Sequence, residues 1–259
     1  MDEFRQQIED LKVCLVIPTY NHDPFIGHVL SDSLQYPIDI LIINDGSTDQ
    51  TRSIVEKIIK ENTNNQKIEM VTFSKNKGKG AAIKAGAKRA LKLGYKAIIT
   101  MDSDGQHFPS DLKKFMDQAL KTPKAIIVGS RGIEHENMPK KNTKANKISN
   151  FWFHFQTRIN LPDTQSGFRY YPLSCFQRSI WFTDRYNFEL EIMVRNIWRG
   201  FHVVPIPIQV YYPPKGVRVT HFRPTVDFLR ITLLNTFLSI IAVIYYYPKK
   251  AILKLLNKY

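Results

Sequence analysis

The first half of the chain alternates short apolar runs, bounded by turn residues, with longer segments whose apolar residues recur at helical spacing. The runs predict buried β-strands at Val13–Pro18, Asp39–Asn44, Ile68–Phe73, Ala97–Met101 and Ala125–Gly129. The longer segments predict helices at Ile26–Leu34, Thr48–Asn62, Gly80–Leu93 and Ser110–Lys121. Continuous apolar strands alternating with helices predict an α/β fold, with a Rossmann-like, mostly parallel sheet covered by helices on both faces.

The pattern becomes irregular after about Gly129. Residues 131–147 are basic and predict a loop, and a Pro-rich basic linker begins at Pro213. The remaining predicted elements are helices at Ile148–Ile159 and Phe188–Trp198 and an extended segment at Val203–Val210. We therefore expect a catalytic domain of residues 1–215 and a tail of residues 216–259.

Polar clusters follow three of the predicted strands: Thr19-Tyr20-Asn21, Asp45-Gly46-Ser47 and Asp102-Ser103-Asp104. Ligands of open parallel sheets bind beyond the carboxyl ends of the strands. We therefore expect the three clusters to form a single crevice.

Asp102 and Asp104 flank one residue where a buried strand meets a loop. Their like charges repel unless a cation lies between them, and Mg²⁺ or Mn²⁺ with oxygen ligands would relieve the repulsion. The alternative is a helix entry with Asp104 or Ser110 as the cap and Pro109 at an early helical position.

The run Gly78-Lys79-Gly80 lies between the third predicted strand and a helix. It lacks the third glycine of a dinucleotide-binding motif. Free backbone N–H groups at a helix start still suit a pyrophosphate, while a simple turn with a lysine-rich rim is the alternative.

Four motifs together resemble family 2 glycosyltransferases of the GT-A fold. They are Val16-Ile17-Pro18-Thr19-Tyr20-Asn21, Ile43-Asn44-Asp45-Gly46-Ser47-Thr48-Asp49, Asn76-Lys77-Gly78-Lys79-Gly80 and Asp102-Ser103-Asp104-Gly105-Gln106. Further motifs resemble the dolichyl- or polyprenyl-phosphate sugar synthase branch of that family, namely Gly129-Ser130-Arg131, Asp163–Arg169, Phe188–Glu191 and Val204–Ile208. The resemblance covers roughly residues 12–212.

The resemblance implies a role for each matching residue. Pro18, Thr19, Tyr20, Asn21, Asp45, Lys79, Gly80, Asp102 and Ser103 would bind the nucleotide sugar, and Asp102, Asp104 and Gln106 would hold Mg²⁺ or Mn²⁺. Arg131, Arg169 and Arg218 would contact the acceptor phosphate, and Asp104, Arg169, Glu189 and Asp163 are the candidate catalytic residues. For Arg169, a structural pair with Glu189 or Glu191 is the alternative.

The chain departs from the family pattern at two positions. His22 stands where members usually have Glu, and Asn44-Asp45 replaces a common Asp-Asp pair. Both departures leave the choice between UDP and GDP donors open.

The overall composition limits the class of protein. The 259 residues are 43% hydrophobic and carry a formal charge of +14, which favours phosphate-rich partners. No nucleic-acid-binding motif is visible, so nucleic acid is not an expected partner, whereas a homo-oligomer is compatible with the sequence. Cys14 and Cys175 lie in apolar surroundings and predict free thiols in a reducing compartment, and the charged N-terminus does not resemble a signal peptide.

The tail contains 17 uncharged residues, Ile231–Tyr247, with basic residues on both sides. This length is at the lower limit for a membrane span, and spanning would place four lysines on the outer side. We expect a helix lying in the interface with its lysines on anionic head groups, at the cytoplasmic face of the membrane. A span and a soluble core or dimer helix are the alternatives.

These features predict a metal-dependent, inverting transfer of a hexose from a nucleotide-diphospho-sugar to a membrane acceptor, as in cell-envelope biogenesis. Polyprenyl phosphate is the expected acceptor because an anionic nucleophile needs arginines rather than a strong base. The alternative is a hydroxyl of a lipid or polysaccharide precursor, with Asp163, Glu189 or Glu191 as the base. A nucleotide-sugar- or nucleic-acid-binding protein without turnover is a third, weaker hypothesis.

Overall fold

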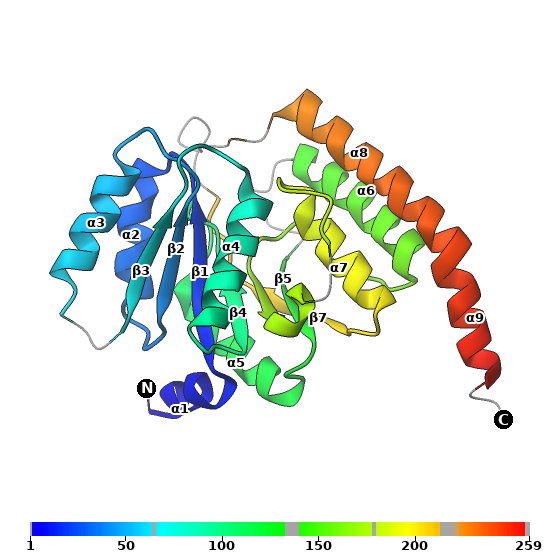
Figure 1. The fold of residues 1–259 in the computed structure, drawn as a ribbon, viewed down its shortest axis with the longest axis horizontal. Helices are drawn as coiled ribbons and strands as arrows, with labels where there is room; N and C mark the ends of the chain where they lie inside the picture. Colours follow the sequence, from blue (N-terminus) through cyan, green and yellow to red (C-terminus); the bar gives the residue numbers. More distant parts are fainter. Residues whose placement is uncertain are drawn as a thin grey trace.

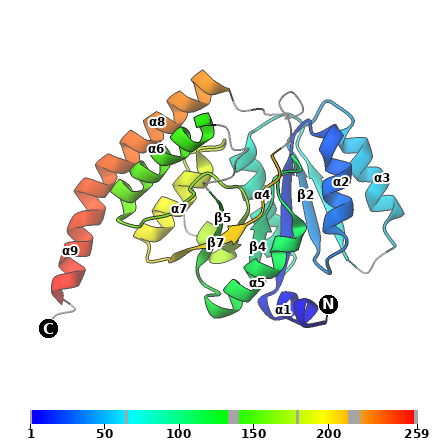
Figure 2. The same cartoon turned by 180° about the vertical axis from the view of Figure 1, so that it is seen from behind.

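The computed structural model describes residues 2–63, 66–132, 140–177, 180–212, 221 and 223–256. A seven-stranded sheet, ordered β3-β2-β1-β4-β6-β5-β7, lies between helical layers (Figures 1 and 2). The strands are β1 (Val13–Thr19), β2 (Ile40–Asn44), β3 (Ile68–Thr72), β4 (Ala97–Thr100), β5 (Ile126–Arg131), β6 (Arg169–Pro172) and β7 (Val203–Ile208). β6 runs antiparallel to β4 and β5, and the other pairs are parallel. The predicted mostly parallel α/β sheet is therefore confirmed.

Helices cover both faces of the sheet, as predicted. One layer contains α1 (Asp2–Leu11), α2 (Asp23–Ser33), α3 (Thr51–Glu61) and α5 (Leu112–Lys121), which follows a 3₁₀ turn at Pro109–Asp111. On the other face α4 (Lys79–Lys92) packs directly on β1, β2 and β4. Beyond α4 lie a 3₁₀ turn (Leu173–Phe176), α6 (Lys140–Thr157), α7 (Phe188–Trp198), α8 (Pro224–Ile241), a π-helical turn (Ala242–Tyr246) and α9 (Tyr247–Leu256).

The central strands are buried along their whole length. All seven residues of β1 and all five of β2 are buried, since α4 covers one face of these strands and the α1–α2 layer covers the other. A strand buried on both faces needs apolar side chains at every position, which explains the continuous runs in the sequence. The polar residues that can bind a ligand therefore lie in the loops at the ends of these strands.

Three features differ from the sequence-based expectations. The antiparallel strand β6 was not predicted, because its four residues include Arg169 and two tyrosines and form no apolar run. Helix α1 was also missed, although Phe4, Ile8 and Leu11 form a buried face. The loop predicted for residues 131–147 is wrong from Lys140 onward, where α6 begins.

Both cysteines are buried free thiols, as predicted. Cys14 lies in β1 and Cys175 in the 3₁₀ turn after β6. Burial raises the pKa of both thiols, that of Cys175 to about 12. Neither thiol therefore forms a reactive thiolate at neutral pH.

Gly86 allows α4 to lie directly against β1. A Cβ atom at Gly86 would come 2.5 Å from Cγ1 of Val16, whereas one at Gly27, in α2, would meet Ile54 at an ordinary 3.5 Å. Gly86→Ala should therefore destabilise the protein by about 1–3 kcal/mol. Gly27→Ala should be neutral or stabilising by up to about 1 kcal/mol, because alanine favours helix. Urea unfolding of both variants measures the difference, and equal stabilities would contradict the close packing.

Candidate active site

The loops after β1, β2 and β4 meet at the carboxyl edge of the sheet. The backbone N–H of Asn21 donates to Ser47 Oγ at 3.0 Å, and that of Thr48 donates to Asn21 Oδ1 at 2.8 Å. Ser103 Oγ donates to the carbonyl of Pro18 at 3.0 Å. The predicted convergence of the three polar clusters is thus confirmed.

Asp45, predicted to bind the nucleoside, fixes the next loop of the site. Its carboxylate accepts hydrogen bonds from the N–H groups of Lys77 and Gly78, both at 2.7 Å, and from the Asn76 side chain at 3.0 Å. Arg185 donates to Asn76 Oδ1 at 3.1 Å, which links this loop to the segment before α7. Asp45 therefore orders the loop that begins α4.

The two glycines at the start of α4 are explained by close packing. A Cβ at Gly78 would come 2.6 Å from the Arg185 side chain, and one at Gly80 would overlap Cβ of Phe188. The N–H of Ala81 already donates to the carbonyl of Asp184 at 2.9 Å. That N–H group is therefore not available to a pyrophosphate.

Lys79 lies at the centre of the site. Its ammonium contacts Asp102 Oδ1 at 2.7 Å and Glu189 Oε2 at 2.9 Å, and its side chain is 14% exposed. Burial by itself raises the pKa of Asp102, but the ammonium outweighs it and lowers that pKa to about 2. Gly167 lies against this pair, since a Cβ there would overlap Asp102 and come 2.6 Å from Lys79 Nζ. One cation thus joins α4, the loop after β4 and α7.

The carboxylates fit a divalent cation that also binds phosphate oxygens. Burial raises the pKa of Asp104, and the neighbouring charge of Asp102 raises it further, so a cation would relieve the site. Among the described residues no group of three or more His, Cys, Asp or Glu side chains gathers around one point. Asp102, Asp104 and the Gln106 amide would supply part of an oxygen ligand set, with the rest from a diphosphate. In addition, Glu189 Oε1 is buried without a hydrogen-bond partner.

Arg131 and Asp163 form a two-pronged ion pair. Arg131 Nε lies 2.6 Å from Asp163 Oδ2, and Nη2 lies 3.0 Å from Oδ1. Burial alone raises the pKa of Asp163, but the hydrogen bonds from Arg131 outweigh it and lower that pKa. Asp163 is therefore an ionised partner of Arg131, which fixes the end of β5.

Arg169, predicted to contact the acceptor phosphate, is fully buried. Its guanidinium donates to the carbonyls of Ser166, Thr164 and Glu189 at 2.6, 2.9 and 2.6 Å, and to the hydroxyl of Tyr171 at 3.1 Å. In this conformation it does not reach a ligand. Neither carboxylate proposed as its partner binds it, because Glu189 contributes its backbone oxygen and Glu191 pairs with Arg195. Arg169 is a positioning residue that holds the loop before β6 and the start of α7. Arg218 lies outside the described residues.

Two histidines join the donor side of the site. His22 Nδ1 lies 2.6 Å from Ser103 Oγ, and His221 Nε2 lies 3.2 Å from the carbonyl of Asn21. The two imidazole centroids are 5.2 Å apart, and the ring of His221 also contacts Tyr20. Burial lowers the pKa of His22 to about 4, and the neighbouring His221 lowers it in the same direction. The position of His221 depends on the chain returning after β7, which no local motif indicated.

His107 is a further site residue without an expected role. Its Nε2 lies 3.9 Å from Asp102 Oδ2, and its ring contacts Phe168 with centroids 5.2 Å apart. Its Nδ1 is buried without a hydrogen-bond partner. Its place three residues after Asp104 was the available signal.

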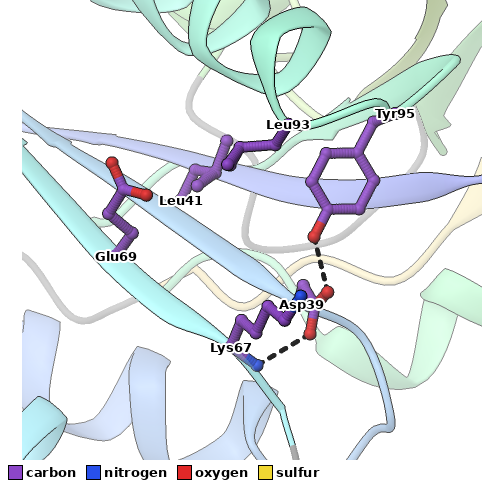
Figure 3. Close-up of a pocket in the computed structure, with 6 residues that line it drawn as sticks. All are labelled: Asp39, Leu41, Lys67, Glu69, Leu93 and Tyr95. Carbon is purple, nitrogen blue, oxygen red and sulfur yellow. Dashed lines mark hydrogen bonds between the residues drawn. The ribbon is translucent and has the colours of Figure 1, made fainter.

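A separate small pocket lies at the opposite, amino edge of the sheet (Figure 3). Tyr95 donates its hydroxyl proton to Asp39 there, and the N–H of Lys67 donates to Asp39 Oδ1 at 2.7 Å. These polar groups satisfy one another. The pocket does not belong to the crevice formed by the strand ends.

Comparison with known proteins identifies the class. Residues 14–181 match the model of glycosyl transferase family 2, so the chain belongs to this family and is a glycosyltransferase. It is 28% identical to a polyprenol monophosphomannose synthase of Mycolicibacterium smegmatis, with 76% of each chain covered. It is 32% identical to a UDP-N-acetylglucosamine–dolichyl-phosphate N-acetylglucosaminyltransferase of Methanococcus voltae, over 65% of this chain and 72% of the relative.

A solved structure supports the predicted GT-A fold. The glucosyl-3-phosphoglycerate synthase of Mycobacterium tuberculosis superposes with a TM-score of 0.63 at 13% identity, over 95% of this chain and 81% of the other. At this identity the likeness shows the fold alone. Together with the two relatives, it confirms the resemblance stated from the motifs.

The buried position of Arg169 can be tested by Arg169→Lys. A lysine side chain has a single nitrogen and cannot donate to all three carbonyls in place of the guanidinium. We therefore expect a loss of about 2–4 kcal/mol in the free energy of unfolding. Arg52→Lys, in an exposed pair with Glu56, should cost less than about 0.5 kcal/mol. A stable Arg169→Lys protein with only a raised acceptor KM would instead show direct phosphate contact.

The depressed pKa of His22 predicts acid sensitivity. The folded protein favours the neutral imidazole of His22. Its contribution to the free energy of unfolding is therefore fully present above about pH 6.5 and is lost as the pH falls from about 6.5 to about 4. Between pH 7 and 5 the loss should be roughly 2 kcal/mol. In urea unfolding, His22→Gln should reduce the loss by that amount, whereas His28→Gln, on the surface, should not. Identical pH dependence in wild type and His22→Gln would refute the assignment.

Proposed function

We propose that this glycosyltransferase transfers a hexose from a nucleotide-diphospho-sugar to polyprenyl phosphate, with inversion at the anomeric carbon. The family and the two relatives named above support the reaction class and a lipid-phosphate acceptor. The choice of a phosphate acceptor rests on one observation: each carboxylate that could act as a general base forms an ion pair with a cationic side chain.

Each carboxylate considered as a general base is paired with a cation. Asp163 lies 2.6 Å from Arg131, Glu189 lies 2.9 Å from Lys79, and Glu191 lies 2.7 Å from Arg195. A carboxylate oxygen held by a cation is not free to take a proton from an acceptor hydroxyl, and for Asp163 the hydrogen bonds from Arg131 also lower the pKa. A hydroxyl acceptor needs such a base, whereas a phosphate acceptor is already anionic.

The reaction then balances without a protein base. An acceptor phosphate oxygen forms a bond to C1 of the hexose, while the bond from C1 to the donor's β-phosphate oxygen breaks. The electron pair of that bond leaves with the nucleoside diphosphate. The protein's task is to align the two phosphates and stabilise charge on the leaving group.

The residues divide between donor and acceptor. Lys79, which is paired with Asp102, would face the diphosphate. The nucleoside would be held by the loops that contain Pro18, Thr19, Tyr20, Asn21, Asp45 and Ser103. Asp102, Asp104 and Gln106 would hold Mg²⁺ or Mn²⁺, which when bound neutralises charge on the departing diphosphate. The structural neighbour binds Mn²⁺ and UDP, which supports this assignment. Arg131 uses Nε and Nη2 for Asp163, and we assign its Nη1 to the acceptor phosphate.

We further propose that residues 1–215 carry catalysis and that residues 216–259 attach the protein to the cytoplasmic face of the membrane. The helical run Thr225–Leu256 is long and apolar enough to reach across a bilayer, by length and composition alone. The lipid-phosphate acceptors in the relatives' names favour a membrane location. The position of the tail is taken up below.

A donor and acceptor panel tests the function. Purified protein in detergent with Mn²⁺ or Mg²⁺ is given UDP- or GDP-sugars together with short-chain polyprenyl phosphate or the matching polyprenol. We expect nucleoside diphosphate release with the phosphate, no release above background with the alcohol, and a loss of at least about 100-fold in Asp104→Asn. Glu56→Gln, on the surface of α3, is the control and should retain full activity. Faster turnover with the alcohol would overturn the phosphate assignment and favour a hydroxyl acceptor.

A further inference from the structure

One face of α8 and of the π-helical turn that follows it carries a stripe of exposed apolar residues. Leu229, Leu233, Phe237, Ile240 and Ile244 follow at steps of four, four, three and four residues, which places them on the same side of a helix. Their exposed fractions are 58, 62, 46, 52 and 72%. Soluble monomers rarely expose apolar patches larger than a few hundred Å², so a stripe of this kind indicates a binding surface.

The opposite face of α8 is packed on the catalytic domain. Leu234, Leu238, Ala242 and Tyr246 are buried in the core cluster that also includes residues of α6 and α7. The helical run therefore lies along the outside of the domain, as Figures 1 and 2 both show. α8 is a structural part of the domain on one side and unpartnered on the other.

Buried polar contacts fix this position. The side-chain nitrogen of Gln156, in α6, donates to the carbonyl and Oδ1 of Asn235 at 3.2 and 3.0 Å. The indole of Trp198 donates to the carbonyl of Gln156, and the hydroxyl of Tyr246 to that of Thr157. A helix that left the domain to cross a bilayer would expose Asp227 and Asn235, now 3% and 5% exposed, to hydrocarbon. The packing favours a helix that stays on the domain.

Aromatic and basic residues lie on α6, which packs on α8, and on α9, which continues the helical run. Phe151, Trp152, Phe155 and Tyr247 form a row of successive ring contacts with centroids 5.4, 6.2 and 6.2 Å apart. Lys250 and Lys254, in α9, are exposed. Aromatic rings and lysines beside an apolar surface are typical of proteins whose contact lies at the head-group level.

The acidic side chain at the start of α8 faces inward. Asp227 accepts hydrogen bonds from the Arg223 N–H at 2.8 Å and from the Arg230 side chain at 3.2 Å. The exposed charges near both ends of the run are therefore mainly basic, complementary to anionic lipid.

We propose that this stripe is a monotopic membrane-docking surface. It inserts into one leaflet of an anionic bilayer, with the α8–α9 run lying in the plane of the interface and the catalytic domain on top of it. The inference rests on the proposed function only for the lipid nature of the acceptor, and its tests measure binding and geometry without turnover.

A chain of contacts links the stripe to the active site. Phe182 is 60% exposed and packs edge-to-face on Phe237, with ring centroids 5.7 Å apart. The backbone N–H of Phe182 donates to Glu191 in α7 at 3.0 Å, two residues from the Glu189 that binds Lys79. Docking through the stripe thus brings the Lys79 site close to the leaflet that would hold a lipid phosphate.

Vesicle flotation tests the surface. Full-length protein is mixed with phosphatidylcholine vesicles containing or lacking 30% phosphatidylglycerol. Replacing Leu233 and Phe237 by serine should reduce the bound fraction at least about tenfold on anionic vesicles. The matched control replaces Leu91 and Leu120, which are 47% and 45% exposed on α4 and α5, and should bind like wild type. Equal loss in both variants, or unchanged binding in the first, overturns the proposal.

Spin-label depth distinguishes docking from spanning. Cys14 and Cys175 are buried, so a label placed by Leu229→Cys, Phe237→Cys, Ile244→Cys or Ile252→Cys reports its own position. The helix rises about 35 Å between Leu229 and Ile252. In-plane docking predicts similar, shallow depths at all four positions. A deep centre with shallow ends shows a span, and label–label contact in detergent without lipid shows a second copy on the stripe; either result overturns the proposal.

The two proposals can fail separately. If the stripe variant floats normally while wild type transfers sugar to polyprenyl phosphate, only the docking surface is wrong. If wild type docks through the stripe and yet prefers the polyprenol, only the acceptor assignment is wrong.

Discussion

The ammonium of Lys79, shared by Asp102 and Glu189, is the interaction on which the site depends. These three residues belong to the first turn of α4, the loop after β4 and the first turn of α7. Two largely buried carboxylates this close would repel each other, and one cation between them offsets that repulsion. The close packing of Gly78 and Gly80 against the segment before α7, and of Gly167 against Asp102, follows from bringing these elements to one point.

Around this centre, a buried arginine side chain binds backbone carbonyls, and a buried carboxylate binds a second arginine. The buried guanidinium of Arg169 donates to the carbonyls of Thr164, Ser166 and Glu189, so that its buried donors have partners. Asp163 is similarly occupied by Arg131. A site built in this way is rigid and rich in fixed charge, and it contains few free bases. Such a site suits the proposed reaction, in which two phosphate-bearing substrates are aligned and the nucleoside diphosphate of one of them is released.

The C-terminal helices pack on the domain and carry the apolar stripe that we propose as the membrane-docking surface. One side of helix α8 buries apolar residues and satisfies its polar groups, whereas the other side is exposed. Because Gln156 and Asn235 fix the helix on α6, the orientation of the apolar stripe relative to the active site is set by the fold. The attachment and the catalytic site are therefore parts of one rigid arrangement.

The sequence by itself determined the parallel core of the sheet and the polar loops at its edge. A strand buried on both faces must be apolar throughout, and a ligand-binding edge must be polar, so local patterns were sufficient for β1, β2, β4 and the aspartates. Tertiary structure alone decided the antiparallel strand β6, the partners of Arg169 and Asp163, and the place of His221 beside Tyr20. These depend on contacts between residues far apart in the chain, for which neither periodicity nor a short motif carries information. The direction of a buried guanidinium, toward a ligand or toward backbone carbonyls, is set by which oxygen atoms the fold brings within reach.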